Sequence, residues 1–304
     1  MSAVIEVQNL RKKYGDVVVV DDVSFTVEKG EIFGILGSNG AGKTTAVECI
    51  EGLRNRDGGN ISVLGLDPYA ERAEITRQLD IRLQGVKPSD RLQVAEALTL
   101  YSSFYRDPAD WRVLIDSLGL TSRTTTNLGE LSHGQKQRLS IALALVGNPQ
   151  VAVFDELTNG LDPHARRETW ETIEAVRASG VTILLVTHFM EEAERLCDRV
   201  ALLNKGRVAA VDTPSGLIQQ IRGNHRIMFH PSLPLDDDLL TRLPGVTGVT
   251  CENDHVTVTA TADVLHLVLS ELARHGIVPE GLRVERVSLE DAFLALTASD
   301  PTER

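Results

Sequence analysis

The sequence predicts an α/β fold followed by a smaller α+β domain. Short apolar, β-branched segments alternate with helix-like segments over the first two-thirds of the chain, which is typical of a buried parallel sheet. A glycine-rich loop, GSNGAGKT at 37–44, joins one of these segments to a helix. The order of elements changes near Asp212. We therefore expect two domains, residues 1–212 and residues 213–304.

Composition narrows the class of protein. The chain has 304 residues, 42% of them hydrophobic, and a net charge of −12 at pH 7. An acidic chain is a poor candidate for binding a nucleic-acid backbone, which needs clustered Lys and Arg, so no nucleic-acid partner is expected. No apolar stretch approaches the roughly 20 residues that cross a bilayer. The amino-terminal residues lack the basic and apolar regions of a signal peptide, so we expect a cytoplasmic protein with reduced thiols at Cys49, Cys197 and Cys251.

Each element of the first domain follows from its pattern. The segment VVVVDDVSFTVEKG is expected to form paired strands, because apolar and polar residues alternate in it. The apolar runs EIFGILG, VAVFDE and VTILLVTH are expected as buried strands. Helical spacing of apolar residues predicts a helix-rich region from Gln84 to about Gly147 and a helix in MEEAERLCDRV. VALLNKGRVAAVD reads as a hairpin that turns at 204–206.

The second domain shows a β-(α)-β-β-α-β order. Strand RIMFH is followed by a turn rich in Pro and Asp, the hairpin VTGVTCENDHVTVTA, helix ADVLHLVLSELARHG and strand LRVERV. This order predicts a small ferredoxin-like α+β domain. A last helix, SLEDAFLAL, follows it.

The loop GSNGAGKT fits the pattern G-x-x-x-x-G-K-[ST] and stands between a strand and a helix, as that pattern requires. Its glycines let backbone N–H groups converge on phosphate oxygens at the positive end of a helix. Lys43 is expected to reach the β- and γ-phosphates, and the hydroxyl of Thr44 to hold Mg²⁺. A glycine-rich turn with a chance lysine is the alternative.

Further candidates lie at the ends of the later strands. Asp155 and Glu156 close VAVFDE, where one carboxylate can bind Mg²⁺ and the next can polarise an attacking water molecule. His188 ends VTILLVTH and could contact a γ-phosphate. Gln84 and Tyr14 are unremarkable alone, although a tyrosine can stack on an adenine ring. Each of these residues could instead have only a structural role.

The segment LSHGQ, residues 131–135, precedes the helix KQRLSIALALV. A hydroxyl and a glycine at the start of a helix make a second anion site. Simple capping of the helix by Ser132 is the alternative.

Taken in order and spacing, these motifs resemble an ATP-binding-cassette (ABC) ATPase over residues 1 to about 212. The later part, notably SLEDAFLALT at 288–297, is similar to the C-terminal domain of exporter ATPases related to the daunorubicin/doxorubicin-resistance subunit. The resemblance implies a P-loop NTPase core, in which a parallel sheet is joined by an antiparallel β subdomain and a helical subdomain. ATP and Mg²⁺ are the implied cofactors.

The resemblance also implies the role of each residue. Glu156 is the general base, His188 contacts the γ-phosphate, and Lys43 completes the catalytic set. Mg²⁺ is served by Thr44, Gln84 and Asp155. The residues expected to contact ATP on this chain or, from the LSHGQ turn, on a second subunit are Tyr14, Gly37, Ser38, Asn39, Gly40, Ala41, Gly42, Lys43, Thr44, Thr45, Gln84, Ser132, Gly134, Gln135 and Asp162.

Two residues depart from the family pattern. His133 stands where Gly is usual, which would strain the backbone if a positive φ is needed there, and we expect it to be tolerated. Leu157 stands where Pro is common, with little effect expected.

The resulting expectation is an ATP-hydrolysing exporter subunit, peripheral on the cytoplasmic face of the membrane. It would form a dimer with a second ATPase subunit and act on a hydrophobic drug-like or lipid cargo through a separate membrane permease. An importer ATPase, or a soluble ABC protein that acts as a mechanical clamp on ribosomes or DNA, stays open as an alternative.

Overall fold

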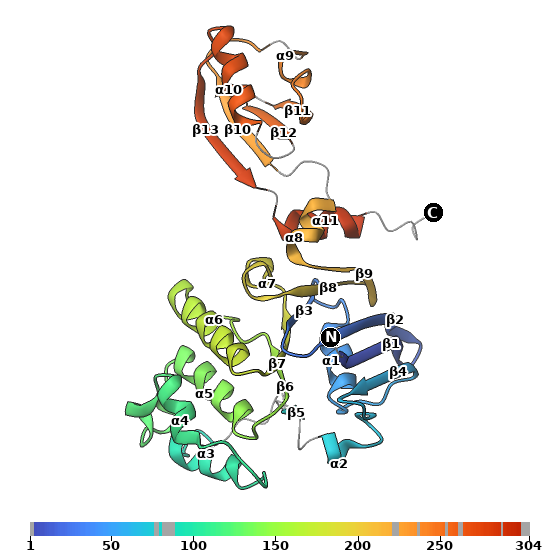
Figure 1. Cartoon of the computed structure of the whole chain (residues 1–304), viewed down its shortest axis with the longest axis vertical. Coiled ribbons are helices and arrows are strands. Elements are labelled where there is room, and N and C mark those ends of the chain that lie inside the picture. Colours follow the sequence, from blue (N-terminus) through green and yellow to red (C-terminus); the bar gives the residue numbers. More distant parts are fainter. Residues whose placement is uncertain are drawn as a thin grey trace. The chain divides into compact units, whose positions relative to one another are not determined.

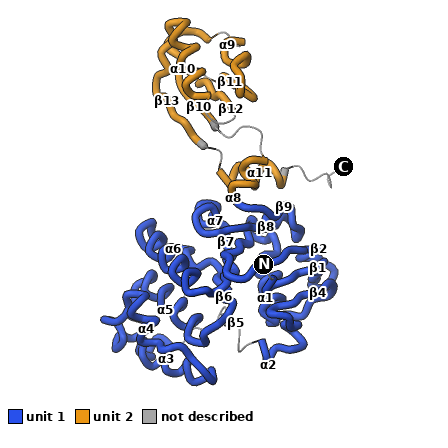
Figure 2. The backbone as a smooth tube through the Cα atoms, in the orientation of Figure 1, with its two compact units in different colours: residues 1–213 blue, residues 214–304 orange. Residues whose placement is uncertain are grey.

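The structure is a computed structural model that describes residues 3–75, 79–80, 89–220, 225–235, 238–252, 255–260, 264–286 and 288–298. The chain forms two compact units, Met1–Thr213 and Pro214–Arg304, drawn in different colours in Figure 2. Each unit has its own hydrophobic core.

A six-stranded sheet forms the centre of the first unit, with the order β5-β6-β7-β3-β8-β9. Neighbouring strands are parallel except for the β8–β9 hairpin, which is antiparallel. The predicted apolar runs form its fully buried middle strands. Strand bounds are β3 (Ile32–Leu36), β5 (Leu79–Asp80), β6 (Val151–Asp155), β7 (Thr182–Thr187), β8 (Arg199–Asn204) and β9 (Arg207–Asp212).

A second, three-stranded antiparallel sheet has the order β2-β1-β4, formed by β1 (Ala3–Tyr14), β2 (Val17–Glu28) and β4 (Gly58–Val63). The expectation that VVVVDDVSFTVEKG forms paired strands was wrong. The segment is one strand that pairs with β1, because Asp22, at φ 62°, bends the strand near a register shift instead of reversing it. The alternation that we interpreted as a hairpin is one buried and one exposed face of a single strand.

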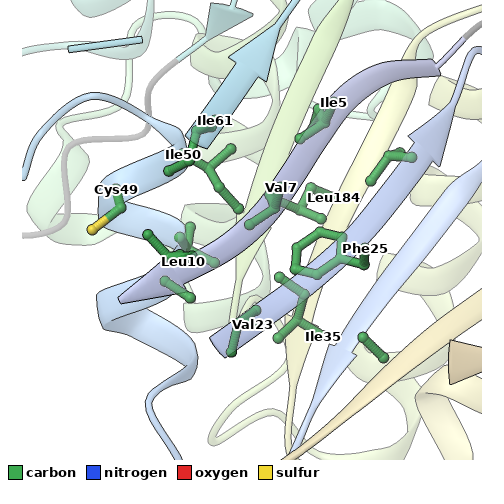
Figure 3. Packing of buried hydrophobic residues seen from close by; sticks show 14 of the residues in the cluster. Ile5, Val7, Leu10, Val23, Phe25, Ile35, Cys49, Ile50, Ile61 and Leu184 are labelled. Atoms are coloured by element: carbon green, nitrogen blue, oxygen red, sulfur yellow. The ribbon is translucent and has the colours of Figure 1, made fainter. Parts of the chain in front are cut away.

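The core of this unit lies where the small sheet meets helix α1 (Lys43–Ile50) and the central sheet. Figure 3 shows Val7, Phe25 and Ile50 pointing into the same space from β1, β2 and α1. The rings of Phe25 and Phe33 stack with centroids 5.1 Å apart, which ties β2 to β3. This packing fixes the end of β3, from which the glycine-rich loop leaves.

Helices complete the first unit (Figure 1). The described part of the region predicted to be rich in helices is helical. Its helices α3 (Val94–Ser102) and α4 (Trp111–Ser117) both pack against α5 (His133–Leu145) and form one lobe. The amphipathic helix expected from MEEAERLCDRV is α7, which is shorter than predicted. The bounds are α2 (Arg72–Ile75), α3 (Val94–Ser102), α4 (Trp111–Ser117), η1 (Thr121–Arg123), η2 (Leu128–Glu130), α5 (His133–Leu145), α6 (Pro163–Ala178) and α7 (Met190–Leu196).

The second unit contains an antiparallel sheet with the order β11-β12-β10-β13. This order, with a helix after the first and the third strand, is the predicted ferredoxin-like arrangement. Outside it, α8 packs against α11, the helix of the SLEDAFLALT segment. The bounds are α8 (Pro214–Gln220), β10 (His225–Pro231), α9 (Asp238–Thr241), β11 (Val246–Glu252), β12 (His255–Ala260), α10 (Leu265–Arg274), β13 (Pro279–Arg286) and α11 (Leu289–Ala298).

All three cysteines are free thiols. Cys49 and Cys197 are buried in the first unit, whereas Cys251 is exposed on β11. Burial raises the pKa of Cys49 to about 11 and the pKa of Cys197 well above its ordinary value.

In the part of the chain that the structure describes, every helix is too short or too polar to cross a bilayer.

Candidate functional site

The glycine-rich loop connects β3 to α1 at the carboxyl edge of the central sheet. Gly42 has a φ of 97°, and a Cβ there would lie 2.7 Å from the carbonyl oxygen of Val19. A Cβ on Gly37 would overlap the carbonyl oxygen of Leu203. Both positions therefore require glycine, while Ser38, Asn39 and Gly40 form an exposed tip whose fold is closed by a hydrogen bond from the Ala41 N–H to the Ser38 carbonyl, 3.1 Å long.

Lys43 is the first residue of α1 and is only 6% exposed. Its ammonium donates to the carbonyl oxygens of Gly37 at 2.8 Å and Ser38 at 3.0 Å, so the charge is held inside the loop. Burial lowers the pKa of Lys43, whereas the nearby carboxylates of Glu156 and Asp155 act in the opposite direction. A cation in such a poorly solvated place interacts strongly with phosphate.

Thr44 and Asp155 line one small cavity of about 40 Å³, together with Val47, Glu48 and Val153, among others. Asp155 ends β6 and is 8% exposed. A hydroxyl and a carboxylate are hard oxygen donors, and Mg²⁺ takes few protein ligands because it keeps water and phosphate oxygens. The described residues contain no group of three or more His, Cys, Asp or Glu that could hold a metal alone. The Thr44–Asp155 pair therefore suits Mg²⁺ bound with a nucleotide.

Glu156 and His188 follow the neighbouring parallel strands β6 and β7, which places them at the same edge of the sheet. His188 Nδ1 lies 3.3 Å from Glu156 Oε1. This contact leaves Nε2 as the ring nitrogen that can face a phosphate. Glu156 has a φ of 49°, a conformation that is uncommon for residues other than glycine, and its N–H donates to the Val186 carbonyl at 2.9 Å.

Asn159 is a neighbour of Glu156 that the sequence reasoning missed. Its Nδ2 donates to Glu156 Oε2 at 3.4 Å, and its backbone N–H donates to the Glu156 carbonyl at 3.1 Å. The position of Asn159, three residues after a strand-end carboxylate and before a glycine, is a turn signal that could have indicated it.

The LSHGQ turn forms the start of α5. Ser132 caps the helix, because its Oγ accepts from the Gln135 N–H at 3.3 Å while Gln135 Oε1 accepts from the Ser132 N–H at 3.0 Å. Ser132 thus has the capping role that was the alternative to anion binding. The two roles are compatible, since Ser132 and His133 remain exposed. The hydrogen bonds of Ser132 and Gln135 close within this turn and not with the loop at 37–44.

The two departures from the family pattern are both accommodated. His133 is the first residue of α5 and is absent from the residues with positive φ, so the backbone strain considered for it does not arise. Its Nε2 lies 3.2 Å from the carbonyl oxygen of Asn159. Leu157 is 1% exposed and packs in the interior after Glu156.

Asp162 caps α6, with its Oδ1 accepting from the N–H groups of His164 at 2.9 Å and Ala165 at 3.0 Å. These hydrogen bonds hold the pKa of Asp162 below its ordinary value. The carboxylate therefore orients the loop that leads from Glu156 into α6.

Tyr14 ends β1 and is 41% exposed, as an adenine-stacking ring would be. The Arg54 guanidinium lies 5.1 Å from its ring centroid and is held by Glu48, 2.6 Å away. Arg54 is a second neighbour that the sequence reasoning did not identify. Gln84, expected at the metal, lies outside the described residues.

Comparisons with known proteins identify the family of the chain. The family described as "ABC transporter" matches residues 20–159. The chain is 38% identical over 302 residues to the Nod factor export ATP-binding protein I of Rhizobium sp. (strain N33), covering 97% of both chains. It is 39% identical to the protein of the same name from Burkholderia pseudomallei (strain 1710b), covering 98% of both.

Solved structures match the first part of the chain. An ATP-binding subunit of an ABC transporter superposes with a TM-score of 0.64 at 32% identity, covering 71% of this chain and 92% of that one. The cbiO1 protein of Clostridium perfringens, at 24% identity and a TM-score of 0.65, supports the fold alone. ATP hydrolysis is the characteristic activity of these subunits. The glycine-rich loop, a buried lysine and strand-end carboxylates lie in one place, and the relatives match 97% or more of the chain. The chain belongs to the ATP-binding subunits of ABC transporters.

Proposed function

We propose that this chain is the ATPase of an exporter, in which residues of the first unit hydrolyse ATP. The observation that carries the proposal is the convergence of Lys43, Asp155, Glu156 and His188 at the carboxyl edge of the central sheet. Ligands of open α/β sheets bind at this edge. The names of the relatives, which describe export, support the direction of transport.

The residues suggest how the reaction proceeds. Residues 37–45 would hold the triphosphate with backbone N–H groups, and Lys43 would exchange its loop carbonyls for phosphate oxygens. Mg²⁺, held by Thr44, Asp155 and Gln84, would neutralise charge on the phosphates. Glu156 would accept a proton from the attacking water molecule. His188, oriented by Glu156, would donate to the γ-phosphate. Tyr14 would stack on the adenine.

A second ATPase subunit would complete the site. Ser132, Gly134 and Gln135 lie on a different lobe from the phosphate loop, and Ser132 is exposed. We propose that this turn binds the γ-phosphate of ATP held by the partner, with Asp162 at the same interface. Two ATP molecules would then lie between two subunits.

A membrane permease is the second proposed partner. The lobe that follows Gln84 exposes apolar side chains, with Leu100 45% and Phe104 69% exposed. The ring centroids of Tyr101 and Phe104 lie 5.9 Å apart, and contiguous exposed apolar surface can mark a protein interface. We propose that this lobe docks onto the permease, so that the chain lies on the cytoplasmic face of the membrane and drives export of a hydrophobic drug-like or lipid cargo.

The hydrolytic assignment is tested with Glu156→Gln. Loss of the general base should reduce turnover at least about 10²-fold while ATP still binds. The measurements are phosphate release and ATP affinity, and gel filtration with ATP should show the variant accumulating as a dimer. A variant that hydrolyses ATP at the wild-type rate would contradict the role of Glu156.

The export assignment is tested in inverted membrane vesicles that contain the chain and a membrane subunit that co-purifies with it. ATP-dependent uptake of a fluorescent lipid or dye is expected with the wild type and not with Glu156→Gln. Co-sedimentation of the chain with ribosomes instead of membranes would favour the clamp alternative. A requirement for a secreted binding protein would favour an importer.

A further inference from the structure

We propose that His133 is a positioning residue that links the turn before α5 to the loop carrying Glu156. The inference rests on the proposed function only for the role of Glu156 as the base. The contacts themselves belong to one unit and involve residues 26 positions apart in the sequence.

The first contact identifies Nε2 as a ring nitrogen of His133 that carries a proton. His133 Nε2 lies 3.2 Å from the carbonyl oxygen of Asn159. A carbonyl can only accept a hydrogen bond, so Nε2 must carry the proton. Both the neutral Nε2–H tautomer and the imidazolium satisfy this condition.

The turn at Asn159–Gly160 lies beside the ring of His133. Gly160 has a φ of 72°, and a Cβ at that position would lie 3.8 Å from His133 Nε2, at ordinary van der Waals contact. The turn at Asn159–Gly160 is thus presented directly to the imidazole. A glycine at position 133, as in the family pattern, has no side chain with which to make this contact.

The second contact passes from Asn159 to the carboxylate. The backbone N–H and the side-chain Nδ2 of Asn159 donate to the Glu156 carbonyl at 3.1 Å and to Glu156 Oε2 at 3.4 Å. The other carboxylate oxygen, Oε1, lies 3.3 Å from His188 Nδ1. One residue of the loop, Asn159, therefore accepts from His133 through its carbonyl oxygen and donates to Glu156 through its backbone N–H and its side-chain amide.

A consequence for catalysis follows from this chain of contacts. The turn that carries His133 is proposed to contact ATP held by the partner subunit, whereas Glu156 acts on ATP held by its own subunit. Movement of the turn would be transmitted through Asn159 to Glu156. His133 would thereby make the placement of the base in one site depend on the occupancy of the other.

The link can be measured without nucleotide by amide hydrogen exchange of residues 156–162. His133→Ala removes the donor and avoids the backbone freedom of glycine. The amides of Asn159 and Leu161 should then exchange about two- to tenfold faster, the range for losing one ordinary hydrogen bond. His133→Gln keeps an N–H donor and should restore slow exchange. His164→Ala, an exposed histidine on α6, is the matched control and should leave these rates unchanged.

Unchanged exchange in His133→Ala overturns the link, and so does fast exchange in His133→Gln with its fold intact by circular dichroism. Since no ATP is present, neither result depends on whether Glu156 is the base. The proposal and the proposed function can therefore fail separately.

ATPase kinetics test whether the contact of His133 with Asn159 affects the Glu156 carboxylate. His133→Ala should lower kcat about three- to tenfold with KM for ATP unchanged within twofold, and His133→Gln should recover kcat. Asn159→Ala removes the contact of Nδ2 with Glu156 Oε2 and keeps the backbone hydrogen bond to Glu156. In this background the same His133 substitution should have less effect, because the side-chain part of the path to the carboxylate is already lost. Additive losses in the double variant would place His133 on the partner's phosphate instead and would overturn the positioning role.

Discussion

His188 stands between a carboxylate and the expected position of a phosphate, and its two ring nitrogens have different tasks. Nδ1 faces Glu156 at 3.3 Å, which orients the ring. The ring of Phe189 lies 4.1 Å from the imidazole by centroid, and the Arg166 guanidinium lies 4.5 Å from the Phe189 ring. The imidazole is therefore held from two sides before any substrate charge develops.

His188→Ala should lower kcat by about 10²-fold and leave KM for ATP within threefold. The reason is that a donor aimed at charge that develops in the transition state contributes little to ground-state binding. Steady-state ATPase kinetics on the purified chain measure both parameters, with His275→Ala, an exposed residue of the second unit, as the control. Parallel losses of affinity and rate would instead identify His188 as a residue needed for binding or folding.

At the scale of elements, the glycine-rich loop needs glycine at position 42 for two reasons. The backbone there has a positive φ, and it lies close to the carbonyl oxygen of Val19 in β2. Gly42 and Gly180 have nearly the same φ, 97° and 95°. A Cβ on Gly42 would be 2.7 Å from the Val19 carbonyl oxygen, whereas a Cβ on Gly180 would meet nothing within 4 Å. Substituting each glycine by alanine therefore distinguishes the cost of a positive φ from the cost of a steric clash.

Gly42→Ala should abolish ATP binding, because the loop must move away from β2 to make room. Gly180→Ala carries only the left-handed strain, roughly 1–2 kcal/mol of stability, and should bind ATP with unchanged affinity. Titration with a fluorescent ATP analogue and thermal unfolding check the two effects. Equal ATP binding by both variants would mean that the loop tolerates the displaced backbone.

The elements predicted from the sequence are those that short local patterns specify. The buried strands, the phosphate loop and the second domain's order of strands were predicted because apolar runs and glycine spacing are local signals. The single strand β2 was not, since Asp21-Asp22 looks like a turn and only pairing with β1 makes it a bend. Strands β1 and β4 and helix α6 were not predicted either. For β4 the reason is distance along the chain, because its Val63 pairs with Ile5 of β1.

The candidate site was predicted as a set of residues but not as a set of contacts. Spacing located Lys43, Glu156 and His188. Only the folded chain brings Asn159 to Glu156 and Arg54 to Tyr14, because these pairs depend on a turn and on a packed helix end. The helix-capping role of Ser132 and the contact of His133 likewise follow from where α5 begins.

At the scale of the whole molecule, every site residue that the structure describes belongs to the first unit. That unit has its own core, built from both of its sheets and α1. A fragment of residues 1–213 should therefore bind ATP within about threefold of the full chain's affinity and hydrolyse it. Calorimetric titration and phosphate release measure this, with the fragment carrying Lys43→Ala as the negative control. A folded fragment without ATP binding would mean that the second unit contributes to the site.

The three thiols differ in burial, so a dye can label the native chain at one cysteine. Thiol-reactive dyes attack the thiolate, so Cys49 and Cys197, which are buried and have raised pKa values, should resist them, whereas Cys251 on β11 should react. A maleimide fluorophore should couple in a 1:1 ratio to the native protein and 3:1 after denaturation, which intact-mass spectrometry can count. The second unit would then carry a single optical reporter without any engineered residue, and energy transfer from a labelled nucleotide could follow that unit through the ATPase cycle.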